Sequence, residues 1–322
     1  MRFDPAFQAL VEFAASRHNA FRTLEAADQA VPAHRRAAPK SPESCCDSTL
    51  DVVTGGGNGI GRHLVFDLLR RGASVAAVDI RQESLDETAS LVGSGAVGPM
   101  APGIEDRLGL IFADVTDRAV CDRLPERVAN AFGPADCLIN NAGIIQPFVR
   151  FNDLEFDDID RVVRVNLYGP LHMTKAFLPG LLERPEAHIA NVSSMGGFLP
   201  VPGQTVYGAT KAAIKLLTEG LHVELLETNV GVSVIMPGGV STDITANSGV
   251  EAPTGVDADD PSSSRIPTTT PSDAATIILD GIEDNELYIH VGMDSKLLHL
   301  ATRTAPKRAA HLIARQMKSL LD

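Results

Sequence analysis

The sequence lacks the charge and the apolar runs of several large protein classes. Acidic side chains outnumber basic ones by 41 to 28, and the formal net charge is −13. A surface of this sign repels the phosphates of nucleic acids, so we expect no nucleic-acid partner. No apolar run approaches the roughly 18 residues that a membrane span requires. We also expect no signal peptide, because no charged start is followed by an uninterrupted apolar core.

Cysteine is scarce, and its spacing does not fit a metal site. The chain has 4 cysteines and none of them forms a C-x-x-C or zinc-type pattern. Cys45 and Cys46 are adjacent, whereas Cys121 and Cys137 fall in helical and strand patterns. This usage favours reduced thiols and a cytoplasmic location, and it predicts no metal ligands.

What the chain does contain is an alternation of strand and helix patterns. With 322 residues, 44% hydrophobic and 21% charged, it has ample material for a core in one domain. The alternation predicts an α/β fold with a doubly wound parallel sheet of about seven strands. The expected strands are 50–54, 74–79, 110–114, 136–140, 187–192, 230–235 and 286–291, and the strongest helices are 60–71, 117–132, 154–183, 204–228 and 271–284.

A glycine-rich run between the first strand and the first helix is the first chemical signal. The run TGGGNGIG at 54–61 leads into the apolar-periodic segment IGRHLVFDLLRRG. A strand, a glycine-rich turn and a helix N-terminus form a site for an anion such as a pyrophosphate. Gly55 would allow the tight turn, Gly59 a close approach of the backbone, and Gly61 close packing of helix on strand. Such a turn also occurs without a ligand, so the next strand supplies the test.

That next strand, in SVAAVDI, ends in Asp79, eighteen residues after Gly61. A carboxylate at this place can accept hydrogen bonds from an adenosine ribose. The same carboxylate would repel a 2′-phosphate, and Asn58 brings no positive charge to the turn, so NAD is favoured over NADP. Arg62 and Arg81 leave an alternative open, since either side chain could reach toward a phosphate. We favour solvated charges at helix ends for both.

Tyr207 and Lys211 in YGATK are four residues apart, which places them on one face of a helix. A free tyrosine has a pKa near 10. A lysine cation about 5 Å away, at an effective dielectric constant of about 20, would favour the phenolate by roughly 3 kcal/mol, or about 2 pKa units. We therefore expect Lys211, helped by a cationic nicotinamide ring, to lower the pKa of Tyr207 toward neutrality. The pattern Y-x-x-x-K alone is common by chance. Its combination with Ser194, thirteen residues before Tyr207, and with the glycine-rich turn favours a functional pair.

Taken together and in order, these motifs resemble those of the short-chain dehydrogenase/reductase family, in its subtype with the shorter core. The match covers about 49–291, and the resemblance implies a single Rossmann-type catalytic domain over 49–292. The motifs that carry it are TGGGNGIG, Asp79, Asp114 with Val115, the NNAG run at 140–143, Asn166, Ser194, YGATK and the PGGVSTD run at 237–243.

The resemblance implies a role for each catalytic position. Tyr207 would be the acid/base, and Lys211 would bind the nicotinamide ribose. Ser194, which has the thirteen-residue spacing that Ser193 lacks, would hydrogen-bond the substrate oxygen. Asn166 would kink its helix and hold a water in the proton relay. The cofactor-binding positions that the resemblance implies are Gly55, Asn58, Gly59, Ile60, Gly61, Asp79, Ile80, Asp114, Val115, Asn141, Ala142, Gly143, Tyr207, Lys211, Pro237, Gly238, Val240 and Thr242.

The implied reaction is direct hydride transfer, without a metal, between NAD(H) and a secondary alcohol or its ketone. We expect Ser194, Tyr207, Ile145, Met195 and Gly196 to contact the substrate. With Ile144, Pro147 and Phe198 they predict a largely apolar pocket, suited to a hydroxysteroid, an apolar cyclic alcohol or a 3-hydroxyacyl group. The alternatives are an NADPH-dependent 3-oxoacyl-type reductase and, from another class, a non-catalytic nucleotide-binding scaffold or redox sensor.

Segments outside the motifs are harder to interpret. Residues 1–48 predict a partly helical extension with a linker-like end, and 93–109 predict a surface loop. Residues 243–270 follow the nicotinamide-binding stretch, where the resemblance implies a substrate lid. The helical tail at 293–322, interrupted at Pro306, is expected to dock on its own domain or a neighbouring subunit rather than on a membrane. Helices 154–183 and 204–228 resemble the pair through which family members form dimers, so a homodimer or homotetramer is expected.

Overall fold

A computed structural model describes residues 49–95, 98, 103–251 and 268–317 of the chain. The N-terminal extension at 1–48, with Cys45 and Cys46, lies outside the described residues, as does most of the 243–270 segment. Within the described ranges no helix is long and apolar enough to cross a membrane.

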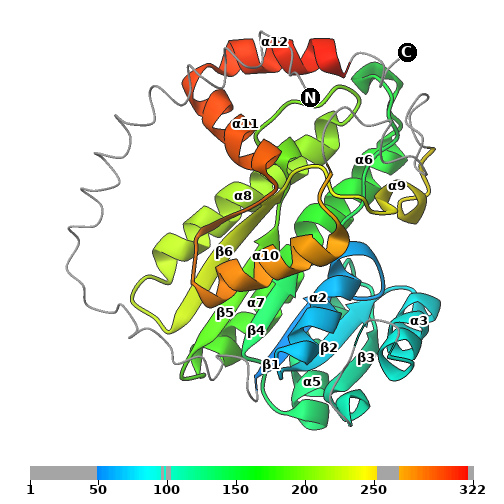
Figure 1. Ribbon diagram of the computed structural model, residues 1–322, viewed down its shortest axis with the longest axis vertical. Coiled ribbons are helices and arrows are strands. Elements are labelled where there is room, and N and C mark those ends of the chain that lie inside the picture. The colour runs from blue at the N-terminus through cyan, green and yellow to red at the C-terminus, as the bar shows by residue number, and fades with distance from the viewer. Residues whose placement is uncertain (1–48, 96–97, 99–102, 252–267, 318–322) are drawn as a thin grey trace.

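One parallel sheet organises the described chain, and its seven strands confirm the predicted fold class (Figure 1). The strand order β3-β2-β1-β4-β5-β6-β7 reverses direction between β1 and β4. At such a reversal the crossovers before and after it leave on opposite faces, which opens a crevice at the carboxyl ends of the strands. The strands are β1 (Leu50–Thr54), β2 (Ser74–Asp79), β3 (Leu108–Phe112), β4 (Cys137–Asn140), β5 (Ala187–Val192), β6 (Val230–Pro237) and β7 (Tyr288–Val291).

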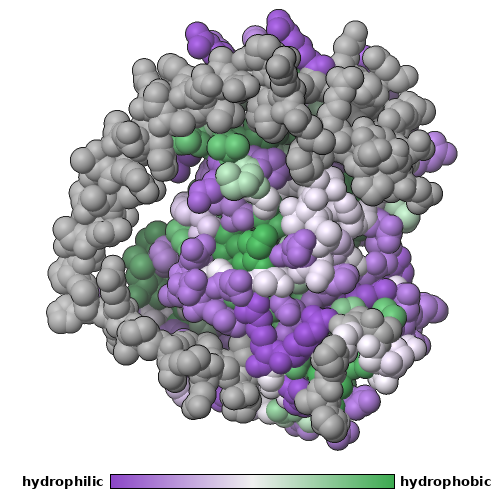
Figure 2. All heavy atoms as spheres, viewed as in Figure 1, coloured by the Kyte–Doolittle hydropathy of each residue, from purple (hydrophilic) through white to green (hydrophobic). Residues whose placement is uncertain are grey.

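Helices cover both faces of this sheet, because the strands are apolar on both sides. On one face α2 (Gly59–Arg70), α3 (Gln82–Gly93) and α10 (Pro271–Glu283) pack on a core that includes Leu64, Leu85 and Ile278. On the other, α4 (Arg118–Cys121), α5 (Leu124–Phe132), α7 (Gly169–Leu182) and α8 (Thr205–Glu224) pack on a second core, with Met173 and Phe177 at its centre. Figure 2 shows the first face, which is hydrophilic over α2 and carries hydrophobic residues over α10.

Two long helices of the sequence prediction are divided in the structure. The helix expected over 117–132 becomes α4 and α5, because Pro125, at the start of α5, has no N–H to continue the hydrogen bonds of α4. The helix expected over 154–183 becomes α6 (Phe156–Val163) and α7, joined by a π-helical turn at Arg164–Tyr168. Both breaks fall within continuous helical patterns of apolar residues, so the apolar periodicity alone does not reveal them.

The loop expected over 93–109 is shorter than predicted. Gly93 ends α3, a helix absent from the strongest predictions, and a 3₁₀ turn at Ile104–Arg107 leads directly into β3, two residues earlier than expected. Ile104 is buried in the first core, and the Arg107 guanidinium donates to the carbonyl oxygens of Leu69 and Ala73. These contacts attach the end of the segment to α2.

The C-terminal tail packs on its own domain as two helices, α11 (Met293–Thr304) and α12 (Pro306–Gln316), at one end of the molecule beyond α8 (Figure 1). Leu298 and Ile313 are buried against Leu199, a residue from the segment between β5 and α8. Pro306 starts α12, so the proline that interrupts the amphipathic pattern marks a helix start. The tail therefore uses its apolar side chains for intramolecular docking.

Asp51 in β1 is a buried carboxyl group that predicts a pH-dependent stability. Burial raises its pKa from 3.8 to about 7, although hydrogen bonds from Thr49 and Cys137 act in the opposite direction. The folded state then holds a proton that the unfolded state has lost, so the free energy of unfolding falls as the pH rises from about 4 to 7. Asp51→Asn removes this penalty without changing the volume. We expect it to stabilise the protein at pH 8 by at most about 4 kcal/mol.

Urea unfolding of wild type and Asp51→Asn at pH 4.5 and pH 8 measures this effect. The exposed Asp86→Asn controls for the loss of one negative charge. A stability difference that is the same at both pH values would show that Asp51 is not a protonated buried acid.

Candidate active site

A cleft of about 370 Å³ opens at the carboxyl ends of the strands, where the strand order reverses. Its walls come from the ends of the strands β1 to β6 and from the segments that follow them. The cleft combines predominantly apolar walls with a few polar groups, which is typical of a small-molecule site.

The glycine-rich turn after β1 forms one wall of the cleft. Gly55 and Gly59 adopt left-handed φ angles of +67° and +52°, which favour glycine. A Cβ atom on Gly61 would overlap the carbonyl oxygen of Gly55, so α2 can approach the turn this closely only with glycine there. The turn thereby presents its backbone beside the start of α2, as an anion-binding site requires.

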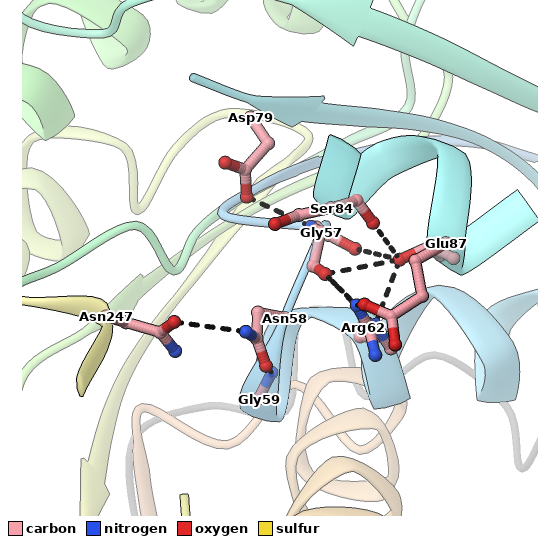
Figure 3. Close-up of polar contacts among 10 residues, drawn as sticks. Gly57, Asn58, Gly59, Arg62, Asp79, Ser84, Glu87 and Asn247 are labelled. Carbon is pink, nitrogen blue, oxygen red and sulfur yellow. Dashed lines mark hydrogen bonds and ion pairs between the residues drawn. The ribbon is translucent and has the colours of Figure 1, made fainter. Parts of the chain in front are cut away.

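Asn58 links the turn to the opposite wall (Figure 3). Its Oδ1 accepts a hydrogen bond from the Gly59 amide at 2.6 Å, which caps α2. Its Nδ2 donates to Oδ1 of Asn247, at 3.1 Å, in the short helix α9 (Ile244–Asn247). Asn247 also lines the cleft. The two asparagines therefore join the glycine turn to α9 across the cleft lining.

Asp79, at the end of β2, is 8% exposed and lines the cleft. Its Oδ2 accepts from the Gly57 amide at 3.0 Å (Figure 3). Its Oδ1 accepts from the Arg81 amide, also at 3.0 Å. These bonds place a negative charge beside the glycine turn. Arg81 lines the cleft beside the carboxylate.

Arg62 points to the other side of the turn (Figure 3). Its guanidinium donates to the Gly57 carbonyl oxygen at 2.6 and 3.0 Å and to Thr88 Oγ1 at 3.0 Å, and it pairs with Glu87 at 2.5 Å. The prediction that Arg62 is a solvated charge at a helix end is therefore wrong, because the Gly57 carbonyl group in the turn accepts hydrogen bonds from it. Arg62 supports the turn from behind.

Ser194, Tyr207 and Lys211 meet inside the cleft, as the sequence predicts. The Ser194 side chain hydrogen-bonds the Tyr207 phenol, and Ser194 Oγ also accepts from the Gly196 amide at 3.0 Å. Lys211 Nζ lies 5.9 Å from the centre of the tyrosine ring and donates to the Val192 carbonyl oxygen at 2.9 Å. The hydroxyl group of Ser193, by contrast, donates to the carbonyl oxygen of Lys211.

The pKa of Tyr207 shifts in the direction opposite to the sequence prediction. Burial raises it, and only the hydrogen bond with Ser194 lowers it. Burial also lowers the pKa of Lys211, to about 8. The prediction assumed a fully charged lysine near the surface, but both groups are enclosed, and desolvation disfavours the charged form of each.

Asn166 lies at the base of the cleft, on the π-helical turn, and is fully buried. Its Oδ1 accepts from the Ile144 amide at 2.9 Å, and its Nδ2 donates to the Ile144 carbonyl oxygen at 2.8 Å. The expected distortion of the helix is present, since a π-helical turn inserts one extra residue. A Cβ on Gly143 would lie 3.4 Å from Asn166 Oδ1 and 3.2 Å from Lys211 Nζ, so Gly143 lies close to both side chains.

Most of the predicted residues line this one cleft. They are Gly55, Asn58, Gly59, Ile60, Asp79, Ile80, Asp114, Val115, Asn141, Ala142, Gly143, Ile145, Ser194, Tyr207, Lys211, Pro237, Gly238, Val240 and Thr242.

Four predicted residues and two other expected pocket residues lie elsewhere. Gly61 and Asn166 pack behind the cleft lining, whereas Gly196 lies against Tyr207, where its Cβ would be 3.2 Å from the ring. Met195 and Phe198 do not line the cleft, because they pack under the C-terminal helices with Leu298 and Ile313. Pro147 is also outside the lining.

Gln146 was missed by the sequence analysis, although it holds the helix that carries Tyr207. Its fully buried side chain accepts hydrogen bonds at Oε1 from the amides of Val206, at 2.8 Å, and Tyr207, at 3.0 Å. Its Nε2 donates to the Gly203 carbonyl oxygen. Because Gln146 lies 60 and 61 residues before the two amides that it caps, no local sequence pattern indicates its role.

The start of the 243–270 segment also contributes more than the sequence indicated. Ile244 and Asn247 line the cleft, and Ser248 Oγ accepts from the Ile145 amide at 3.0 Å. Arg161 of α6 donates to the Ser248 carbonyl oxygen at 2.7 Å. The place of a lid was predicted, but these anchoring residues were not.

Comparisons with known proteins agree with this geometry. The family model described as short chain dehydrogenase matches residues 51–252. SadH of Mycobacterium tuberculosis, described as an oxidoreductase, is 31% identical over 84% of this chain and 96% of its own.

Solved structures share the fold. A serine dehydrogenase in its closed form with NADP+ is 27% identical, with a TM-score of 0.65 over 76% of this chain and 94% of its own. A short-chain dehydrogenase/reductase from Burkholderia phymatum in complex with NAD has a TM-score of 0.66, over 84% and 95% of the two chains, and at 23% identity shows the fold alone. The chain belongs to the short-chain dehydrogenase family and is an NAD(P)-dependent oxidoreductase.

Proposed function

We propose that the protein is an NAD(H)-dependent oxidoreductase that interconverts a secondary alcohol and its ketone by direct hydride transfer. One observation carries this proposal: Ser194, Tyr207 and Lys211 converge in the cleft whose wall is the glycine turn, with Asn166 directly behind them. A scaffold that only bound a nucleotide would have no need for a serine, a tyrosine and a lysine at one point.

The cleft fits a nicotinamide dinucleotide. The glycine turn at the start of α2 suits the pyrophosphate, and Asp79 suits the adenosine ribose. Gly143 leaves open space beside Lys211, where a side chain would press on the ammonium group. Lys211 is positioned for the nicotinamide ribose, and the segment from Pro237 to Thr242 for the nicotinamide. When bound, the nicotinamide ring supplies or accepts the hydride.

The protein's own groups move the proton and stabilise the developing charge. Because burial raises the pKa of Tyr207, the phenol is protonated at neutral pH and can act as the acid in ketone reduction. In alcohol oxidation Tyr207 takes the hydroxyl proton, which requires a positive charge next to the phenol. Ser194 hydrogen-bonds the substrate oxygen as it gains charge. Asn166 is placed to hold a relay water near Lys211.

The cofactor preference is argued from charge. Solved relatives include one with NAD and one with NADP+, so membership of the family does not decide it. The Asp79 carboxylate would repel a 2′-phosphate at the ribose. Arg62 is committed to the Gly57 carbonyl oxygen, Thr88 and Glu87. Arg81 lines the cleft with Asp79, and we propose that its charge is outweighed by this carboxylate, which two amides hold in place.

The substrate end of the cleft supports an apolar alcohol or ketone. Ile144, Ile145 and Ile244 are among the residues that line the cleft, and we assign them to this end. Met195 and Phe198 pack under the tail, so the apolar surface that supports an apolar cyclic alcohol or its ketone comes from the three isoleucines.

A homodimer or homotetramer through α7 and α8 is part of the proposal. On α8 the side chains of Leu216 and Val223 are 70% and 66% exposed, and Leu226, just beyond it, is 60% exposed. Exposed apolar side chains close together on one helix favour an interface between copies.

Replacing Tyr207 tests the assignment of the acid/base. We expect Tyr207→Phe to lower turnover of apolar cyclic ketones with NADH by about 10²–10⁴-fold, while the NADH dissociation constant stays within about twofold because the cofactor wall is unchanged. Tyr288→Phe, which loses a hydroxyl bonded to Glu219 outside the cleft, is the matched control. Near-normal turnover in Tyr207→Phe would contradict the assignment.

Fluorescence titration with NADH and NADPH tests the cofactor preference. We expect wild type to bind NADH at least about tenfold more tightly, which corresponds to about 1.4 kcal/mol. Asp79→Ala should narrow this ratio, whereas Arg81→Ala should not reduce it. Tighter binding of NADPH would favour the alternative of an NADPH-dependent 3-oxoacyl-type reductase and would assign the phosphate to Arg81.

The lowered pKa of Lys211 predicts a further pH dependence of stability. The unfolded state, with an ordinary pKa of 10.5, holds its proton more tightly than the folded state, with a pKa of about 8. The stability of wild type relative to Lys211→Met should therefore increase as the pH rises from 8 toward 10, by at most about 3 kcal/mol. Urea unfolding at pH 7.5 and 9.5 measures this.

Lys215→Met, which removes a lysine one turn further along α8, is the control for the loss of the side chain. A stability difference between wild type and Lys211→Met that does not change over this range would show that burial leaves the pKa of Lys211 at its ordinary value.

A further inference from the structure

The segment from Pro237 to Thr242, which lines the cleft through Pro237, Gly238, Val240 and Thr242, is held by the C-terminal helix α11. Oδ2 of Asp294, in the first turn of α11, accepts a hydrogen bond from the Gly239 amide at 2.9 Å. The next residue, Ser295, is fully buried and donates from Oγ to the Met236 carbonyl oxygen at 2.6 Å. Neither Asp294 nor Ser295 lines the cleft itself.

Glycines on both sides make room for the Asp294 carboxylate. A Cβ atom on Gly238 would overlap both carboxylate oxygens, and one on Gly292 would overlap Oδ1. Gly292 also has a left-handed φ angle of +90°, so the backbone just before α11 takes a conformation that favours glycine. The carboxylate is thus enclosed between two stretches of backbone and has little freedom to move.

The Gly239 peptide group is restrained on its other side as well. The Gly239 carbonyl oxygen accepts from the Thr269 amide at 2.8 Å, and the Ser241 amide donates to the Thr269 carbonyl oxygen at 3.0 Å. Thr269 lies at the end of the 243–270 segment and forms an isolated parallel bridge with Val240. The Gly239 peptide group is therefore held by Thr269, at the end of that segment, and by Asp294, in the C-terminal tail.

We propose that Asp294 is a positioning residue for the nicotinamide half of the cofactor, and this rests on the proposed function. By fixing the Gly239 amide, Asp294 fixes the orientation of the peptide groups on either side, which face the cleft. Loss of the Asp294 carboxylate allows the segment from Pro237 to Thr242 to rotate, so the nicotinamide half of the cofactor loses its contacts. The adenosine half, which lies at the glycine turn and Asp79 in the proposed function, keeps its contacts. The C-terminal tail thereby contributes to cofactor binding without touching the cofactor.

The test separates the two halves of the cofactor with NADH and ADP-ribose, which lacks the nicotinamide. We expect Asp294→Ala to weaken NADH binding about tenfold, as for loss of a hydrogen bond to a charged group, with ADP-ribose binding within about twofold of wild type. Asp294→Asn should restore most of the affinity, because an amide oxygen can still accept from Gly239. Glu126→Gln, an exposed acid in the first turn of α5, is the matched control.

Hydrogen–deuterium exchange without any ligand gives a second readout. Peptides that cover 238–242 should exchange faster in Asp294→Ala, with β7 and α11 unchanged. Equal weakening of NADH and ADP-ribose, or faster exchange throughout β7 and α11, would show a general structural role and overturn the proposal. Unchanged NADH binding would overturn it too. If wild type binds neither molecule, the proposed function itself fails.

Discussion

The hydrogen bonds between Asn141 and the turn after β1 hold the two halves of the site together. Asn141 Nδ2 donates to the carbonyl oxygens of Thr54 and Gly55, at 3.0 and 3.3 Å, while Thr54 Oγ1 accepts from the amides of Asn141 and Ala142. The strand order reverses here, so β1 and β4 are adjacent but their following segments diverge. The glycine turn leaves β1, and the segment beside Lys211 leaves β4. This junction adds side-chain hydrogen bonds to the pairing of β1 with β4 and so fixes the two walls of the cleft relative to each other.

Burial of Tyr207 and Lys211 follows from the same arrangement and has an electrostatic cost. Lys211 is 4% exposed and its ammonium group has a backbone carbonyl oxygen, that of Val192, as its acceptor. Below it, a chain of buried hydrogen bonds runs from Asn140 through Asn191 to Thr218 and ties β4 and β5 to α8. Such a network permits little movement, which keeps Tyr207 and Ser194 in register. The shifted pKa values of Tyr207 and Lys211 are thus the electrostatic consequence of a rigid, enclosed site.

The parts of the structure that sequence reasoning predicts well are those with a local cause. Strands such as 50–54 and 74–79 match to the residue because apolar runs between turn signals define both ends. Most of the cleft lining follows from motifs. Three errors share one cause, which is dependence on distant contacts. The pKa of Tyr207 depends on how deeply α8 is enclosed, Met195 and Phe198 are drawn toward α11 and α12, and Arg62 turns to a carbonyl oxygen rather than to solvent.

Residues without a motif nevertheless hold the motifs in place, and they do so in one way. Gln146 accepts from the amides at the start of α8, Ser248 from the Ile145 amide, and Asp294 from the Gly239 amide. Each of these amides lies where a strand or loop ends, so no neighbouring strand can pair with it. A buried unpaired amide costs on the order of 1–3 kcal/mol. The cleft is made of such segments, and side chains distant in sequence must therefore complete it. The motifs identify the candidate reactive groups. The precise positions of these groups depend on hydrogen-bond acceptors that are distant in sequence and lie close only in the folded chain.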